Sequence, residues 1–138
     1  MRVVQRLALY GTLRRGEPAF KRLGLASKMR FVRHCKLPGV LLDLGDYPAL
    51  VPGDGEVSAE LYEIKGKKIL ALLDAYEETD PKRPDLGLFV RREVELLEPK
   101  VQADVYFYGA GRWPGNARKI ASGDWKRRRL PQLRSPRG

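Results

Sequence analysis

The stretch that decides the fold is a turn near the start of the chain, Leu9-Tyr10-Gly11-Thr12-Leu13-Arg14-Arg15-Gly16. Residues 3–9 before it are largely apolar and partly β-branched, which is typical of a buried strand. Glycine permits a backbone dihedral angle that side chains forbid, so we expect a special glycine conformation at Gly11 and uncovered N–H groups at residues 11–13. Successive uncovered amides form a concave nest that favours an anion, and the two arginines add positive charge beside it. An ordinary connection from a strand to a helix has the same local pattern.

The overall totals describe one globular domain. The chain has 138 residues, of which 43% are hydrophobic, and this length is sufficient for a single core. No apolar run approaches the roughly 18 residues that a membrane span needs, so we expect no membrane association. Pro18 suits the first position of a helix that we expect to continue to about residue 23.

The net charge of +10 is concentrated at the end of the chain. Six basic residues and no acidic residue lie in residues 126–138, which leaves +4 for the rest. We therefore divide the chain into a domain over residues 1–125 and a basic tail over residues 126–138. Such a tail can hold phosphates without sequence preference, although a solvated terminus is the favoured interpretation. No helix-turn-helix, zinc finger or RNA-binding aromatic signature accompanies it.

Cysteine and histidine are too scarce for several kinds of chemistry. Cys35 is the single cysteine and His34 the single histidine, so an internal disulfide is impossible and a structural zinc site is excluded in practice. Neighbouring residues of a strand point to opposite faces, so these two do not form a nucleophile and base pair. We expect a cytoplasmic protein without cofactor or metal, since the first residues lead directly into a strand and no apolar signal region precedes it.

The remaining pattern predicts more strand than helix. Apolar runs predict strands over residues 28–37, 40–44, 57–64, 89–97 and 101–108, and Pro and Gly clusters predict breaks at 38–39, 45–48 and 51–55. Residues 67–77 have apolar side chains at helical spacing, whereas 79–86 and 109–116 read as loops. Because strands outnumber helices without alternating with them, we predict an α+β fold, a small mixed β-barrel of six or seven strands flanked by two or three short helices.

An acidic side chain follows the second predicted helix. Glu77 comes directly after the apolar stripe that ends at Tyr76, at the negative pole of the helix. The helix pole, burial beside Tyr76 and a like charge on Asp74 would each raise the pKa of the Glu77 carboxyl toward a value useful for a general base. A solvated acidic helix end is the common alternative for such a pair of glutamates. No nucleophile elbow, phosphate loop or dinucleotide fingerprint occurs elsewhere.

Four motifs occur in a characteristic order: residues 10–16, Asp43-Leu44-Gly45-Asp46-Tyr47-Pro48-Ala49, Leu73-Asp74-Ala75-Tyr76-Glu77 and Ile120-Ala121-Ser122-Gly123-Asp124-Trp125. Together they resemble the gamma-glutamylcyclotransferase-like family, in particular its small bacterial and archaeal branch, over about residues 7–125. The resemblance implies a six- or seven-stranded mixed barrel with a cavity between the first turn and the helix that carries the acid.

The same resemblance assigns roles to individual residues. Glu77 matches the catalytic glutamate of the family, and Tyr10, Gly11, Thr12 and Leu13 match the loop that holds the substrate carboxylate. Tyr106 falls near a position where an aromatic side chain lines the pocket. The chain departs from the family at two positions: Glu78 stands where a glycine is frequent, and Phe89 stands where a tyrosine is common.

The implied activity is a gamma-glutamyl cyclotransferase reaction, with a small gamma-glutamyl amine or amide as substrate. The α-amino group of the substrate attacks its own γ-carbonyl and gives 5-oxoproline and a free amine, with Glu77 as general acid and base. The turn amides hold the α-carboxylate and set the attack geometry. Two alternatives stay open: a non-catalytic module of this fold that binds a small anion, and a nucleic-acid-associated protein that acts through its basic tail.

Overall fold

The structure is a computed structural model that describes residues 5–45, 47–66, 68–77, 89–109 and 117–127. Its elements, in chain order, are β1 Arg6–Leu9, α1 Pro18–Arg22, the 3₁₀ helix η1 Leu25–Ser27, β2 Met29–Asp43, β3 Pro48–Ile64, α2 Lys68–Tyr76, β4 Phe89–Glu95, β5 Gln102–Tyr108, β6 Arg118–Lys119 and the 3₁₀ helix η3 Trp125–Arg127. The predicted loop over residues 79–86 and most of the one over 109–116 lie outside the described residues.

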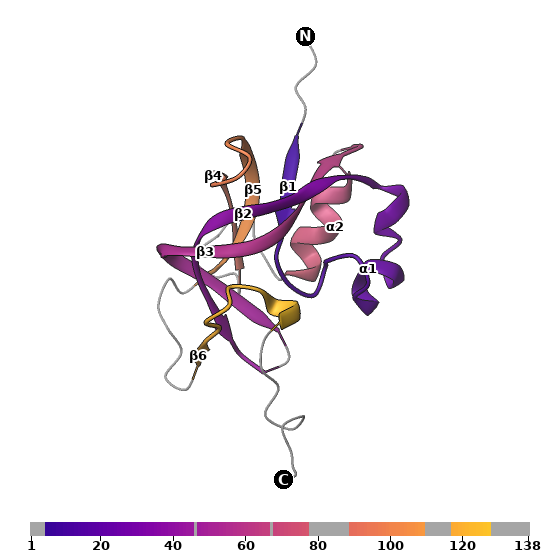
Figure 1. The fold of residues 1–138 in the computed structure, drawn as a ribbon. Helices are drawn as coiled ribbons and strands as arrows, with labels where there is room; N and C mark the ends of the chain where they lie inside the picture. Colours follow the sequence, from indigo (N-terminus) through magenta and orange to yellow (C-terminus); the bar gives the residue numbers. More distant parts are fainter. Residues whose placement is uncertain (1–4, 46, 67, 78–88, 110–116, 128–138) are drawn as a thin grey trace.

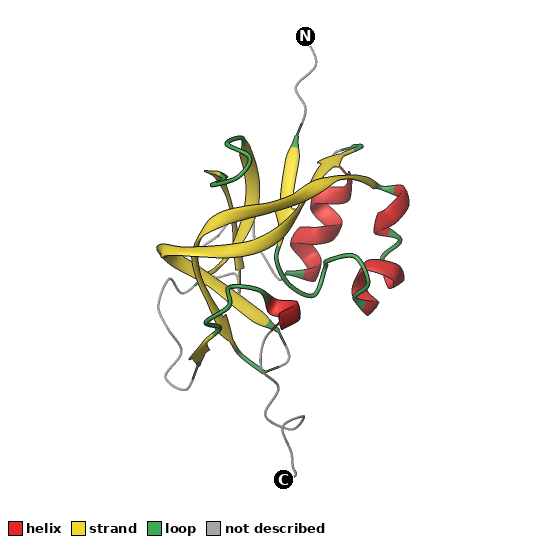
Figure 2. Cartoon of the chain, in the orientation of Figure 1, coloured by secondary structure: helices red, strands yellow, loops and turns green. Residues whose placement is uncertain are grey.

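The strands form one mixed, curled sheet of six strands in the order β4-β5-β1-β3-β2-β6 (Figure 1). β1 pairs in parallel with β5, and every other neighbouring pair is antiparallel. The sheet curls into a half-barrel, and helices α1 and α2 gather on one side of it (Figure 2). The predicted α+β barrel-like fold is confirmed, with six strands and short helices.

Strand β1 is the centre of the sheet and is buried on both faces. Leu7 and Leu9 pack in the cluster that includes the apolar side of α2, whereas Ala8 packs in the cluster on the inner side of the curl. Consecutive strand residues point to opposite faces, and a strand covered on both sides therefore reads as a continuous apolar run. The buried strand predicted before the turn is confirmed, and Tyr10, which follows it, packs in the same cluster as Ala8.

Two predicted strand breaks are wrong. β2 continues through Pro38 and Gly39 instead of ending there, and β3 continues through residues 51–55 instead of turning. The two long strands stay paired, but their register shifts between Pro38↔Glu56 and Val40↔Val51. Gly39 has φ of 149°, and a Cβ added there would lie 2.6 Å from Leu50 Cδ1. The Pro and Gly residues thus mark a bulge that bends the strand pair, which is how a long hairpin curls into a half-barrel.

The helices cover one side of the sheet. α1 begins at Pro18 as predicted, and α2 buries Ile69 and Leu73, as its helical apolar spacing predicts. α2 ends at Tyr76. This end lies next to the turn that follows β1, as the distance of 3.1 Å between the hydroxyl groups of Thr12 and Tyr76 shows. Within the described residues, none of the helices has the length and apolar character needed to cross a membrane.

Candidate active site

A cavity of about 290 Å³ lies between the turn after β1 and the end of α2. Its walls combine the backbone of the turn, one carboxyl group and several aromatic rings. The lining residues are Ala8, Leu9, Tyr10, Gly11, Thr12, Leu13, Tyr47, Pro48, Tyr76, Glu77, Phe89 and Tyr106. The structure therefore brings all six predicted site residues to one cavity, although their roles stay predictions.

The turn presents uncovered amides. The N–H of Arg14 donates to the carbonyl of Gly11 at 3.1 Å, which closes a four-residue turn. Within the described part of the chain, no hydrogen bond is made by the N–H groups of Gly11, Thr12 or Leu13. Free donors that follow one another around a tight turn favour an anion.

Gly11 is required by a close approach and not by an unusual dihedral angle. Its φ does not lie in the left-handed region, in contrast to Gly16 at the end of the turn, whose φ is 87°. A Cβ added to Gly11 would lie 2.6 Å from Cγ of Pro48. The first and second sequence motifs therefore contact each other, and the sequence expectation of a special glycine conformation is wrong at this position.

Glu77 lies half-buried in the cavity wall, immediately after α2, and its N–H donates to the carbonyl of Leu73 at 2.9 Å. Burial raises the pKa of the Glu77 carboxyl from 4.5 to about 8, and the negative charge of Asp74 adds to the shift. In the described residues, the carboxyl has no hydrogen-bond partner. An acid of this kind can exchange a proton with a ligand at neutral pH.

A hydrogen-bonded chain holds the wall behind Glu77. Asp74 is buried and accepts from Arg91 Nε and Nη2 at 2.9 and 3.1 Å and from the Tyr106 hydroxyl at 2.6 Å. The Tyr10 hydroxyl donates to the carbonyl of Tyr106 at 2.6 Å. Burial and the charge of Glu77 raise the pKa of Tyr10, so this hydroxyl stays protonated and acts as a donor. These contacts connect β1, α2, β4 and β5 around the cavity.

The two arginines of the turn do not supply charge to the nest, in contrast to the sequence expectation. Arg14 is 4% exposed and forms ion pairs with Glu60 and Asp124, at 3.3 and 2.8 Å. The Arg15 guanidinium carbon lies 3.6 Å from the centre of the Phe31 ring. The turn therefore offers an anion its backbone dipoles and the Thr12 hydroxyl, and no side-chain cation.

Aromatic side chains complete the cavity, and two of them, Tyr47 and Tyr76, were not predicted as site residues. Tyr47 and Phe89 pack edge to face with ring centres 6.0 Å apart, and Phe89 packs likewise on Tyr108. Phe89, the departure from the family pattern, thus lies in the wall of the site, whereas Glu78 lies outside the described residues. Tyr47 and Tyr76 lie inside the quoted sequence motifs, and this position was the sequence signal that could have identified them as site residues.

His34, Cys35 and a group of lysines lie away from this cavity. Cys35 is buried and His34 is exposed, so the two point to opposite sides of β2 as predicted. A second hollow of about 330 Å³ borders the start of α2 and is lined by Lys28, Lys65 and Lys68 with Ser27, Gly66, Ile69 and Leu72. No carboxyl is found among its described lining residues, and neither Glu77 nor the turn after β1 borders it.

The fold and site define a small half-barrel protein in which an acid and a turn of free amides share one cavity. The sequence model described as "Gamma-glutamyl cyclotransferase, AIG2-like" matches residues 7–127, so the chain belongs to this family, and the family prediction is confirmed. No protein with a curated function matches the sequence.

Solved structures agree with this assignment. An AIG2-like protein from Mus musculus is 29% identical, with 82% of each chain covered and a TM-score of 0.62. Protein ytfP from Escherichia coli is 28% identical over 90% of this chain and 98% of its own, with a TM-score of 0.61. An uncharacterized protein from Pyrococcus horikoshii is 25% identical over 88% of this chain and 90% of its own, with a TM-score of 0.63.

Proposed function

We propose that this protein is a gamma-glutamyl cyclotransferase that converts a small gamma-glutamyl amine or amide to 5-oxoproline and a free amine. The observation that carries the proposal is the shared cavity of about 290 Å³, which is lined by Glu77 and by residues 11–13, whose N–H groups make no hydrogen bond in the described part of the chain. Membership of the gamma-glutamyl cyclotransferase, AIG2-like family supports it.

The turn amides would hold the α-carboxylate of the substrate. Three successive donors at Gly11, Thr12 and Leu13 match an anion, and the hydroxyl of Thr12 adds a fourth polar group at the same edge. Anchoring the carboxylate places the neighbouring α-nitrogen and the γ-carbonyl within one enclosed space. The substrate then loses its orientational entropy on binding and not in the reaction step, which can lower the barrier by several kcal/mol.

Glu77 would move the protons. Its carboxylate takes a proton from the α-ammonium, and the freed nitrogen attacks the γ-carbon, so that a new C–N bond forms and closes the five-membered ring. The bond from the γ-carbon to the leaving nitrogen then breaks. Two protons leave the α-nitrogen in all, and both end on the leaving amine, which departs as an ammonium. Burial raises the pKa of Glu77 to about 8, which brings it toward that of the substrate α-ammonium and makes the transfer less unfavourable than transfer to an ordinary carboxylate.

Aromatic rings would surround the leaving group and exclude water. Tyr47, Tyr76 and Phe89 line the cavity beside Glu77. This chemistry uses the nucleophile of the substrate, so the proposed reaction calls for no cofactor. Cys35 is a free, buried thiol, which suits a reducing compartment, and we propose the cytoplasm as its location.

The test is release of 5-oxoproline from a panel of gamma-glutamyl amines and amides by the wild type, Glu77→Gln and Glu93→Gln. Glu93 is an exposed carboxyl on β4 and serves as the matched control. We expect turnover by wild type and control, and a loss of about 10²- to 10⁴-fold for Glu77→Gln. Equal rates for wild type and Glu77→Gln would remove Glu77 from the mechanism, and no release from any compound would refute the activity.

A further inference from the structure

A buried group of charged side chains lies directly behind the turn and outside the cavity. Glu60, in the middle of β3, is 2% exposed, and Arg14 is 4% exposed. Burying a charged pair costs more free energy than its attraction returns unless every polar atom is satisfied, and apolar side chains of the same size stabilise a core at least as well. A role other than stability therefore has to explain why Arg14 and Glu60 are buried together.

The Glu60 carboxylate collects donors from the turn itself. It accepts from the backbone N–H of Arg15 at 2.8 Å, from the Tyr62 hydroxyl at 2.7 Å and from Arg14 Nε at 3.3 Å. The side chain of Arg14 and the backbone of Arg15 therefore both bind the carboxylate of Glu60 on β3. The bond to the Arg15 N–H fixes the direction of the peptide group between Arg14 and Arg15.

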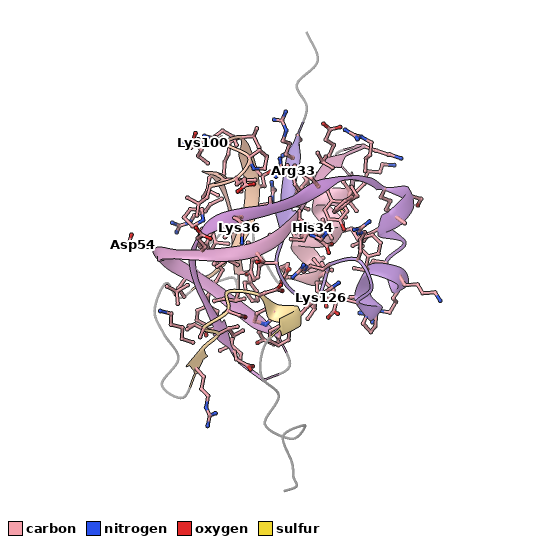
Figure 3. All side chains as sticks on the ribbon, in the orientation of Figure 1. Arg33, His34, Lys36, Asp54, Lys100 and Lys126 are labelled. Carbon is pink, nitrogen blue, oxygen red and sulfur yellow. The ribbon has the colours of Figure 1, made fainter. Side chains whose placement is uncertain are left out.

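The same group reaches the far end of the described chain. Arg14 Nη1 donates to Asp124 at 2.8 Å, and the N–H of Lys126 donates to Asp124 at 3.0 Å. The Lys126 ammonium donates to the carbonyl of Arg15 and lies 3.8 Å from the Glu60 carboxylate. Figure 3 labels Lys126 beside the loop that follows β1. Two carboxylates and two cations thus enclose the rear of the turn.

Backbone packing holds η3 in place for this contact. The N–H of Ser58 donates to the carbonyl of Gly123 at 2.7 Å, and Trp125 is buried in the inner cluster. The proposed domain boundary at residue 125 stays a prediction, but Lys126 contacts the turn and so takes part in the domain.

We propose that Arg14, Glu60 and Lys126 are positioning residues that orient the free amides of the turn toward the cavity. This inference rests on the proposed function, since it concerns the site that holds the substrate carboxylate. Glu60 accepts from the N–H of Arg15 and two carboxylates neutralise Arg14, so the substrate carboxylate would meet the N–H groups of residues 11–13 without a free guanidinium beside them. Arginine suits this place because its planar fork can satisfy both carboxylates at once.

Lys126 is the most accessible member and gives the cleanest test. Its side chain is about one-third exposed, so Lys126→Met removes the ammonium without opening a core cavity. The matched variants are Lys126→Arg, which keeps the charge, and Lys119→Met, which removes an exposed lysine from β6. The readouts are KM and kcat for 5-oxoproline release, and the Kd of 5-oxoproline measured by calorimetry.

We expect Lys126→Met to raise KM and the Kd of 5-oxoproline by about fivefold, with kcat changed by less than twofold, since loss of one such contact corresponds to about 1 kcal/mol. Lys126→Arg should restore most of the affinity, and Lys119→Met should have no effect. A variant that loses only thermal stability, with KM and Kd unchanged, would reduce the group to a structural role and overturn the inference.

Glu60→Gln provides the second test, because glutamine keeps an acceptor for Arg15 and Tyr62 but removes the negative charge. A larger increase in KM is expected, together with faster amide hydrogen exchange at residues 14–15 in folded protein. Wild-type protein that binds 5-oxoproline but releases none from any substrate would refute the function alone. Equal 5-oxoproline affinity in wild type, Lys126→Met and Glu60→Gln would refute the positioning role alone, and a wild type that binds no 5-oxoproline would refute both.

Discussion

Replacing Glu77 with glutamine tests the site through stability as well as through rate. The wild-type carboxyl is half-buried and has a pKa of about 8, well above its usual value of 4.5. Its folded pKa is raised, so the folded state binds more protons than the unfolded state between these two values. Stability of the wild type is therefore expected to fall as the pH rises from about 4.5 to about 8. Glutamine cannot ionise, so the Glu77→Gln variant does not lose stability in this way as the pH rises.

The size of the effect follows from the shift. A change from 4.5 to about 8 corresponds to an upper limit of about 5 kcal/mol, at roughly 1.4 kcal/mol for each pH unit. Solvent reaches part of the Glu77 side chain and screens its charge, so we expect about 2 kcal/mol. For a domain of this size, 1 kcal/mol moves Tm by about 3 °C, and Glu77→Gln should thus melt about 6 °C above the wild type at pH 9.

The assay is thermal unfolding of wild type, Glu77→Gln and Glu93→Gln at several values between pH 4 and pH 9. The difference between Glu77→Gln and wild type should be near zero at pH 4, grow between pH 5 and pH 8, and then level off. The exposed Glu93 should show no such growth. A constant difference across the range would mean that Glu77 ionises like a solvated surface carboxyl, and the argument for a tuned general base would fail.

Four further outcomes are expected. Gly11→Ala should raise KM by about tenfold and destabilise the fold by about 1–3 kcal/mol, because the alanine Cβ would lie 2.6 Å from Pro48. Steady-state kinetics measure the first effect and denaturant unfolding the second, and an unchanged KM would contradict the packing argument. The kcat/KM of the wild type should rise with pH through about 8, as Glu77 becomes a carboxylate able to accept a proton. Asp74→Asn should move that profile to lower pH on the same substrate, because a like charge beside Glu77 is lost; a profile that does not move would show that the substrate ammonium dominates it. Deleting residues 128–138 should leave 5-oxoproline release unchanged and weaken heparin retention; retention that stays the same would argue against the nucleic-acid alternative.

The local sequence pattern predicted most helices and strands, but it failed where the pairing of two strands determines whether the chain turns or bulges. The helix from Pro18, the helix that ends before Glu77 and the buried strand before the first turn follow from spacing and composition. The breaks expected at 38–39 and 51–55 do not, because Pro and Gly signal both chain turns and bulges. Only the pairing of β2 with β3 selects the bulge, and that pairing depends on contacts between two strands that local composition does not encode.

The sequence by itself determined the kind of residues available: a glycine turn after a buried strand, one acid after an amphipathic helix, and a family whose model covers residues 7–127. The tertiary structure decided where their charges act. It placed Glu77 in a cavity wall beside Asp74, and it buried Arg14 against Glu60 and Asp124 instead of leaving it for a ligand. Burial and the distance between charges set the electrostatics of a site, and both depend on contacts between segments that the order of residues does not reveal.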